Sequence, residues 1–273
     1  MKSDRLPTYF ISHGGGPWPW LKKEMPFYGN LEASLQTMVR ELGEKPRAVL
    51  VVSGHWEEAD FAVMAAANPG MLYDYGGFPE HTYHIQYPAP GAPELALRVS
   101  ELISKAGLES HLDDERDFDH GTFVPLFVMY PNAEVPVFQV SIRSDYDPEA
   151  HLKLGRALAP LRDEGVLIVA SGLSYHNLRN FFQPDKAAHP SREFDQWLGE
   201  SLLKATGAAR NEHLQRWNEA PSARAAHPRE DHLIPLMVAV GAAENEEAHL
   251  VYHEDDFMVG LTVSSYRFVD FVR

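Results

Sequence analysis

Three predicted strands lead into a histidine, and imidazole side chains gathered in this way could bind a metal ion. The three pairs are Thr8–Ser12 with His13, Ala48–Gly54 with His55, and Val166–Gly172 with His176 shortly afterwards. Ligands of open α/β sheets bind beyond the carboxyl ends of the strands, where such side chains converge. A single histidine at a strand end is more often an ordinary hydrogen-bonded residue. Three at equivalent ends favour a polyhistidine site for zinc, iron or another metal that binds imidazole.

Two further histidines stand at predicted helix starts and could join the same site. His120 lies in "DFDHGTF" and His232 opens "DHLIPLMVAV". Glycines near the histidines leave room for a ligand and for close backbone approach, namely Gly14, Gly54 and Gly172. The other nine histidines are expected to be structural, in polar or surface-like contexts or in a loop: His81, His84, His111, His151, His189, His213, His227, His249 and His253.

The glycine loop "HGGGP" that begins at His13 allows two other interpretations. Such a loop forms the oxyanion hole of some esterases, but those enzymes need a G-x-S-x-G nucleophile elbow. The nearest candidate is "GLSYH", Gly172–His176, which ends in histidine instead of glycine. A phosphate cradle needs G-x-G-x-x-G or a Walker lysine, and "GGGPWPW" has neither. The glycines are therefore interpreted as space beside a histidine ligand.

The amino-acid composition limits the kinds of binding partner and chemistry that are expected. The chain has 273 residues, with 24 basic and 39 acidic side chains and a formal charge of −15, which argues against nucleic acid and anionic membranes. It has no cysteine, so thiol catalysis and cysteine-ligated metals are excluded. The sequence shows neither an apolar signal region at its start nor an apolar run long enough to cross a bilayer, and a cytoplasmic protein is expected.

Short apolar runs alternate with helical patterns, which is typical of an α/β sheet of parallel or mixed order. Besides the three strands above, strands are predicted at Phe61–Ala67, Val135–Ile142, His249–His253 and Met258–Phe268. Helices are predicted at Glu32–Gly43, Ala92–Gly107, Gly121–Tyr130, Asp147–Gly165, Pro190–Gly207 and Arg229–Ala243. No linker interrupts the pattern. We expect one α/β domain over residues 1–273, with a central mixed or parallel sheet flanked by helices and a metal site at the C-terminal ends of its strands.

Seven stretches together resemble the class III extradiol ring-cleavage dioxygenases, the LigB-type superfamily, in the branch similar to DOPA 4,5-dioxygenase. They are "HGGGP", "VVSGHW", "YDYGGFP", "YPAPG", "DFDHGTFVP", "VASGLSYHNL" and "EDHLIPL". They follow the family's order from His13 to about Pro235, and in combination they are specific. The resemblance implies a single α/β domain with a mononuclear non-haem Fe(II) site, in which Zn²⁺ can also be bound.

The resemblance also implies a role for each histidine. His13, His55 and His232 correspond to metal ligands. His176 corresponds to the catalytic acid/base, close enough to the metal to coordinate it when substrate is absent. His120 corresponds to a second catalytic histidine that contacts substrate or oxygen. Since many ring-cleavage dioxygenases use two histidines and one carboxylate, Glu230 is the weaker candidate for the third ligand.

The implied reaction opens a small aromatic diol, DOPA or another catechol, beside its hydroxyl groups with O₂. Two alternatives remain open: a zinc-dependent hydrolase using the same residues, and a non-catalytic metal-binding protein of this fold. A homo-oligomer is compatible with the sequence.

The surroundings of the site are predicted less specifically. The Gly- and Pro-rich stretch Asn68–Gly91 is expected to be a long loop and a candidate lid. Neither Arg143 nor Arg179 stands out as a partner for a substrate carboxylate. Aromatic residues near the motifs could wall a flat slot, although each alone is more often a packing residue: Trp18, Trp20, Trp56, Tyr73, Tyr75 and Phe78.

Overall fold

The computed structural model describes residues 5–258 and 260–270, and eight strands of this part form one sheet. The strand order is β4-β3-β5-β2-β6-β1-β8-β7. The strands are β1 Thr8–Ser12, β2 Ala48–Glu58, β3 Phe61–Met64, β4 Ser110–Asp113, β5 Val137–Arg143, β6 Val166–Gly172, β7 Ala248–Phe257 and β8 Leu261–Phe268. The middle four, β5, β2, β6 and β1, run parallel, and antiparallel pairings occur on both sides of them. The sheet is therefore mixed, as predicted.

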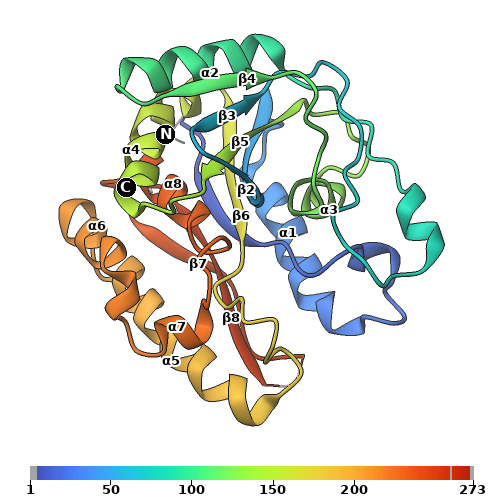
Figure 1. Cartoon of the computed structure of the whole chain (residues 1–273), viewed down its shortest axis with the longest axis vertical. Helices are drawn as coiled ribbons and strands as arrows, with labels where there is room; N and C mark the ends of the chain where they lie inside the picture. Colours follow the sequence, from blue (N-terminus) through green and yellow to red (C-terminus); the bar gives the residue numbers. More distant parts are fainter. Residues whose placement is uncertain (1–4, 259, 271–273) are drawn as a thin grey trace.

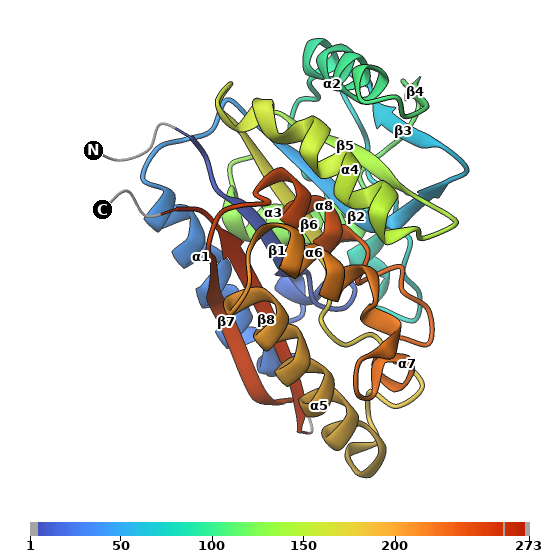
Figure 2. The same ribbon diagram turned by 90° about the vertical axis from the view of Figure 1, so that its left-hand side faces the viewer.

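Helices lie on both faces of the sheet. They are α1 Gly29–Leu42, α2 Pro93–Lys105, α3 His120–Met129, α4 Pro148–Leu158, α5 Pro184–Leu203, α6 Gly207–Gln215, α7 Ala223–Ala226 and α8 Pro235–Ala242. In Figure 1, α1 and α3 lie to one side of the sheet and α4 and α6 to the other. Figure 2 shows α4, α6 and α5 in front of the strands. Because helices cover both faces, β1 and β6 are buried along their whole length and need continuous apolar runs.

The register of the parallel strands brings their carboxyl ends to one level. Ser12 of β1 pairs with Gly172 of β6, and Ser53 of β2 pairs with Ser171 beside it. His13 follows directly from this edge. The prediction ended strand β2 at Gly54, but the strand continues to Glu58. Its pairing with β5 has a register shift between Val52 and Glu57. His55 thus lies in an irregularity within the strand, a type of feature that redirects a side chain.

Several predicted element boundaries are wrong. Helix α8 begins at Pro235, so His232 lies in the turn before the helix. Helix α5 begins at Pro184 and passes through Pro190, where the prediction placed its start. Strand β4 was not predicted because its sequence, "SHLD", has no apolar alternation. In the described part of the chain, no helix is long and apolar enough to cross a membrane.

Candidate active site

Five histidines distant in sequence meet in one cavity at the carboxyl ends of β1, β2 and β6. The cavity has a volume of about 400 Å³, a size that holds a small organic ligand. Its wall includes all five predicted site residues, namely His13, His55, His120, His176 and His232, together with Asp74. The structure thus brings the five histidines singled out in the sequence to one cavity.

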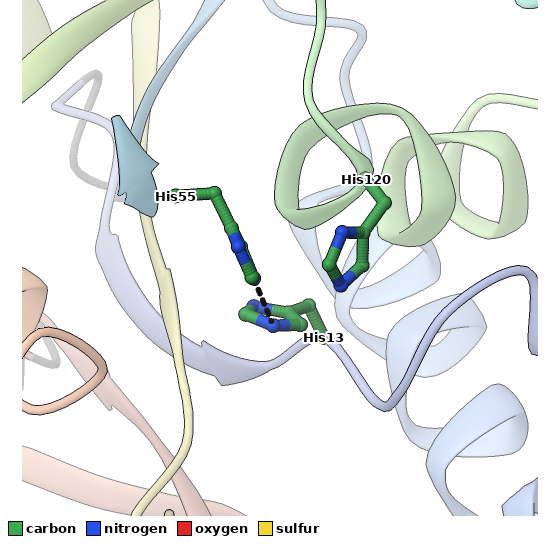
Figure 3. A group of neighbouring side chains, drawn as sticks. All are labelled: His13, His55 and His120. Atoms are coloured by element: carbon green, nitrogen blue, oxygen red, sulfur yellow. Dashed lines mark hydrogen bonds between the residues drawn. The ribbon is translucent and has the colours of Figure 1, made fainter. Parts of the chain in front are cut away.

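Three Nε2 atoms lie close together in this cavity. The Nε2 atom of His55 lies 3.2 Å from that of His13 and 3.1 Å from that of His232. Figure 3 shows His13 and His55 joined by this short contact, with the ring of His120 facing them from the start of α3. His120 and His55 have ring centroids 4.1 Å apart. His13, His55 and His120 form a buried group of candidate metal-binding side chains.

Neighbouring groups fix which ring nitrogen of each histidine carries its proton. The hydroxyl of Ser171 donates to the carbonyl of Gly121, so its oxygen accepts from Nδ1–H of His13 at 3.0 Å. The carboxylate of Asp231 accepts from Nδ1–H of His232 at 2.7 Å. With their protons on Nδ1, both rings present an Nε2 lone pair to the cavity.

Asp74 joins His55 to His120. One carboxylate oxygen, Oδ1, accepts from Nδ1 of His120 at 2.7 Å and from its backbone N–H at 3.1 Å. The other, Oδ2, lies 3.3 Å from Nδ1 of His55. Burial alone would raise the pKa of Asp74, but the hydrogen bonds from His120 and the electrostatic interaction with His120 and His55 lower it. The site therefore contains a fixed carboxylate.

Burial keeps the clustered imidazoles neutral. It lowers the pKa of His13 and His232 well below the ordinary value, and the neighbouring histidines lower both further. The pKa of His55 falls to about 4, chiefly through burial and through His120. The pKa of His176 falls to about 3, mainly through burial. A neutral imidazole is the form that binds a metal ion.

These observations fit a metal ion. Lone pairs 3.1–3.2 Å apart repel one another unless a cation lies between them. Metal–nitrogen bonds of about 2.0–2.1 Å at angles of 90° to 109° separate ligand nitrogens by about 2.9–3.4 Å, which matches the distances from Nε2 of His55 to Nε2 of His13 and of His232. The Nδ1 atom of each of these histidines faces a serine hydroxyl or an aspartate carboxylate, that of Asp74 included. Such partners orient metal-binding histidines.

His176 lies against His232. The two rings stack with centroids 3.4 Å apart and an angle of 15° between their planes. Nδ1 of His176 is 3.9 Å from Oδ1 of Asp231, whose other oxygen bonds His232. Burial raises the pKa of Asp231 to about 6. Glu230, the weaker candidate ligand, pairs instead with Arg224 at 2.6 Å and does not line the cavity.

The glycines serve close packing more than they provide empty space. A Cβ atom on Gly172 would lie 2.1 Å from the carbonyl oxygen of His232, and one on Gly54 would lie 2.7 Å from that of Asp231. The loop carrying both residues can therefore lie directly on β2 and β6. On Gly14, where φ is +80°, a Cβ would meet Trp18 and Tyr28. Gly14 lines the cavity, but aromatic rings fill the side on which its Cβ would lie.

The aromatic residues named from the sequence mostly pack outside the cavity. Of the six, only Phe78 lines it. Trp18 is buried and donates to the carbonyl of His13 at 2.8 Å. Trp20 packs on Phe127. The loop Asn68–Gly91 includes a 3₁₀ helix, Glu80–His84, and contributes Asp74 and Phe78 to the cavity wall.

Two histidines predicted to lie in polar or surface-like contexts are in fact buried. His151 accepts from the backbone N–H of Arg143 at 3.0 Å through Nε2 and donates to Asp147 through Nδ1. His227 bonds the carbonyl of Ser174 at 2.9 Å. Both are structural, as expected, but inside the protein. In the described chain, Arg143 pairs with Asp145 and lies away from the cavity.

Sequence reasoning missed three supporting residues, Asp74, Asp231 and Ser171. Asp74 lies within the quoted stretch "YDYGGFP" and Asp231 directly precedes His232, so a search for carboxylates that orient histidines would have found both. Ser171 is one of several buried strand serines, and nothing in its sequence context distinguishes it.

Comparison with known proteins identifies the family. The profile described as the catalytic LigB subunit of aromatic ring-opening dioxygenase matches residues 8–268. The chain belongs to this family. It is an extradiol ring-cleavage dioxygenase, and its curated relatives carry matching names. A protein of Beta vulgaris named 4,5-DOPA dioxygenase extradiol is 40% identical over 265 residues, covering 96% of each chain.

Further relatives extend this LigB family assignment. Proteins of the same name from Portulaca grandiflora and Escherichia coli K12 are 42% and 36% identical, covering 82% and 90% of this chain and 83% and 89% of their own. The crystal structure of the uncharacterized protein JW3007 from Escherichia coli K12 superposes with a TM-score of 0.76 at 31% identity, covering 96% of this chain and 99% of that one. The comparisons favour the dioxygenase over the hydrolase and binding-protein alternatives.

Proposed function

We propose that this LigB-family chain opens the ring of a catechol beside its hydroxyl groups, using O₂ and an Fe(II) ion held by His13, His55 and His232. The observation that carries this proposal is the close approach of three Nε2 atoms, with that of His55 3.2 Å from that of His13 and 3.1 Å from that of His232, each on a ring whose Nδ1 faces an oxygen partner. Zn²⁺ fits the same imidazoles. A bound Fe(II) would supply Lewis-acid positions for the catechol oxygens and for O₂.

His176 is proposed as the acid/base residue. It lines the cavity and stacks on His232, which places it beside the proposed ligands. As a neutral imidazole it accepts the proton of a catechol hydroxyl and later returns it. Asp231, 3.9 Å from Nδ1, stabilises the charge that His176 carries between these steps.

His120 is proposed to form a hydrogen bond with an oxygen atom of the catechol or of O₂. Its Nδ1 is held by Asp74 at 2.7 Å, and the rest of the ring faces the cavity (Figure 3). Because Nδ1 already carries a proton, Nε2 can donate a hydrogen bond to a developing negative charge only when the ring holds a second proton and is cationic. The carboxylate of Asp74 balances that charge in a buried site.

Three broader expectations accompany this proposal. One catalytic domain spans residues 1–273, the protein works in the cytoplasm, and its partners are a small aromatic diol and O₂. The relatives named for DOPA support a catechol as the substrate class.

Loading with Fe(II) under anaerobic conditions, followed by catechol and oxygen, tests the proposed reaction. We expect one O₂ consumed per catechol and a yellow ring-opened product. Prior removal of metal with a chelator should abolish both signals, and Fe(II) should restore them. Absence of oxygen uptake with every catechol overturns the proposal, and hydrolysis of an ester by the zinc form would support the hydrolase alternative instead.

A further inference from the structure

The cavity wall combines polar and apolar side chains. The histidines and Asp74 belong to its polar part, and its apolar part includes Leu178, Phe181, Phe182 and Met258, which we call the apolar rim. Leu178 is 66% exposed and Phe182 is 74% exposed. Large apolar side chains exposed together at a binding cavity indicate contact with an apolar ligand group.

The backbone holds much of the rim in place. The segment between β6 and α5 makes consecutive turns, in which Asn180 bonds the carbonyl of Asn177 at 3.0 Å. The side chain of Asn177 donates to the carbonyl of Ala225 at 2.8 Å. Phe181 packs against Tyr175 with ring centroids 6.1 Å apart. Leu178 and Phe182 are thus carried by an anchored segment.

The described part of the chain offers this surface no lysine or arginine. Arg179 follows Leu178 in sequence but does not line the cavity, and Arg116 is bound to Asp119 and to the carbonyl of His55. The carboxylate of Asp74 does line it. A carboxylate on the substrate would therefore meet apolar side chains and a negative charge, which is unfavourable.

We propose that the apolar rim is a subsite for an uncharged, apolar substituent of the catechol ring, so that the enzyme prefers alkyl- or aryl-catechols to catechols bearing a carboxylate. This inference rests on the proposed ring cleavage and adds the substrate class. With the hydroxyl groups at the histidines, a ring substituent pointing outward lies between Leu178 and Phe182. Each CH₂ group removed from water there contributes about fourfold to kcat/KM.

A pair of substrates with equal numbers of heavy atoms provides the test. 4-Isobutylcatechol and 3,4-dihydroxyphenylacetate differ in replacing two methyl groups by two carboxylate oxygens. Oxygen uptake by the Fe(II)-loaded full chain gives kcat/KM for each, and anaerobic titration calorimetry gives Kd without turnover. We expect isobutylcatechol to be preferred by at least about tenfold in both measurements, and DOPA to behave like the carboxylate.

Charge-introducing variants locate the subsite. Leu178→Arg and Phe182→Arg change exposed positions and should fold. Each should raise the ratio of dihydroxyphenylacetate to isobutylcatechol turnover by about tenfold, since the new cation pairs with the carboxylate. Leu97→Arg, at a 54% exposed leucine of α2, is the matched control and should leave the ratio unchanged.

The possible outcomes separate the two proposals. If dihydroxyphenylacetate is used as well as isobutylcatechol or better, the apolar subsite is wrong while the proposed ring cleavage stands. If Arg179→Ala then removes the preference for dihydroxyphenylacetate, Arg179 is the cation that binds its carboxylate. Failure of every catechol to react or bind overturns the proposed function and the subsite with it. If Phe182→Arg changes the mass in sedimentation but not the ratio, a second copy of the chain covers the rim and the subsite is wrong.

Discussion

The carboxylate of Asp74 contacts two histidines of the site at once, with Oδ1 2.7 Å from Nδ1 of His120 and Oδ2 3.3 Å from Nδ1 of His55. Asp74 comes from the loop Asn68–Gly91, whereas His55 lies in β2 and His120 at the start of α3. One side chain thus fixes the orientation of a proposed ligand relative to that of a proposed catalytic residue.

Asp74→Asn should lower kcat by about 10- to 100-fold. The amide oxygen can still accept from His120, but the amide nitrogen would then face the Nδ1–H of His55, so that two donors oppose each other. We also expect weaker Fe(II) binding in competition with a chelator. Glu80→Gln, at an exposed position of the same loop, is the control. Wild-type turnover and metal affinity in Asp74→Asn would contradict the role given to this contact.

His176→Ala and His232→Ala should both lose activity, but for different reasons. The first removes the proposed acid/base group and should reduce turnover by more than about 100-fold while most metal stays bound. The second removes a proposed ligand and should release metal. Elemental analysis of the purified variants, beside steady-state oxygen uptake, distinguishes them. Complete loss of metal from His176→Ala would instead make His176 an obligatory ligand.

Gly172→Ala should destabilise the protein by about 1–3 kcal/mol and weaken metal binding. The new methyl group would lie 2.1 Å from the carbonyl oxygen of His232, so the loop must move away from β6. Gly76→Ala is the matched control, because its Cβ meets nothing within 4 Å, and it should change stability by less than about 0.5 kcal/mol. Urea unfolding measures both. Equal stability of the two variants would show that the loop does not depend on this close approach.

His151 should make stability depend on pH away from the active site. Burial lowers its pKa to about 4, against about 6.5 in the unfolded chain. The unfolded state therefore binds the proton first as pH falls. The stabilisation is fully present above about pH 6.5 and is lost between pH 6.5 and 4, by about 3 kcal/mol in total.

Urea unfolding of wild type and His151→Gln across this range checks the prediction. The variant keeps an acceptor for the backbone N–H of Arg143 but has no titrating group. It should be less stable at pH 7 and show a shallower fall in unfolding free energy toward pH 4. Parallel curves for the two proteins would rule out His151 as a source of the dependence.

Much of the fold follows from local pattern. The predicted bounds of β1 and β6 agree with the structure, since a short apolar run followed by small or polar residues defines each of these buried parallel strands. The start of α3 was also predictable, because Asp119 caps it by accepting from the backbone N–H of Thr122. Strand β4 was not predictable from local pattern, because its pairing with β3 outweighs weak local preferences. The passage of α5 through Pro190 was not predictable either, because packing against β8 outweighs them there.

The sequence by itself determined which imidazoles reach the site, because buried strands and a capped helix can deliver His13, His176 and His120 only to the carboxyl edge of the sheet. Only the tertiary structure decided how these groups act. The lone pairs of Nε2 face one another because Ser171 and Asp231 hold the Nδ1 protons, and Ser171 reaches His13 from the neighbouring strand β6. Hydrogen-bond direction depends on positions in space, which residue types and spacing do not specify.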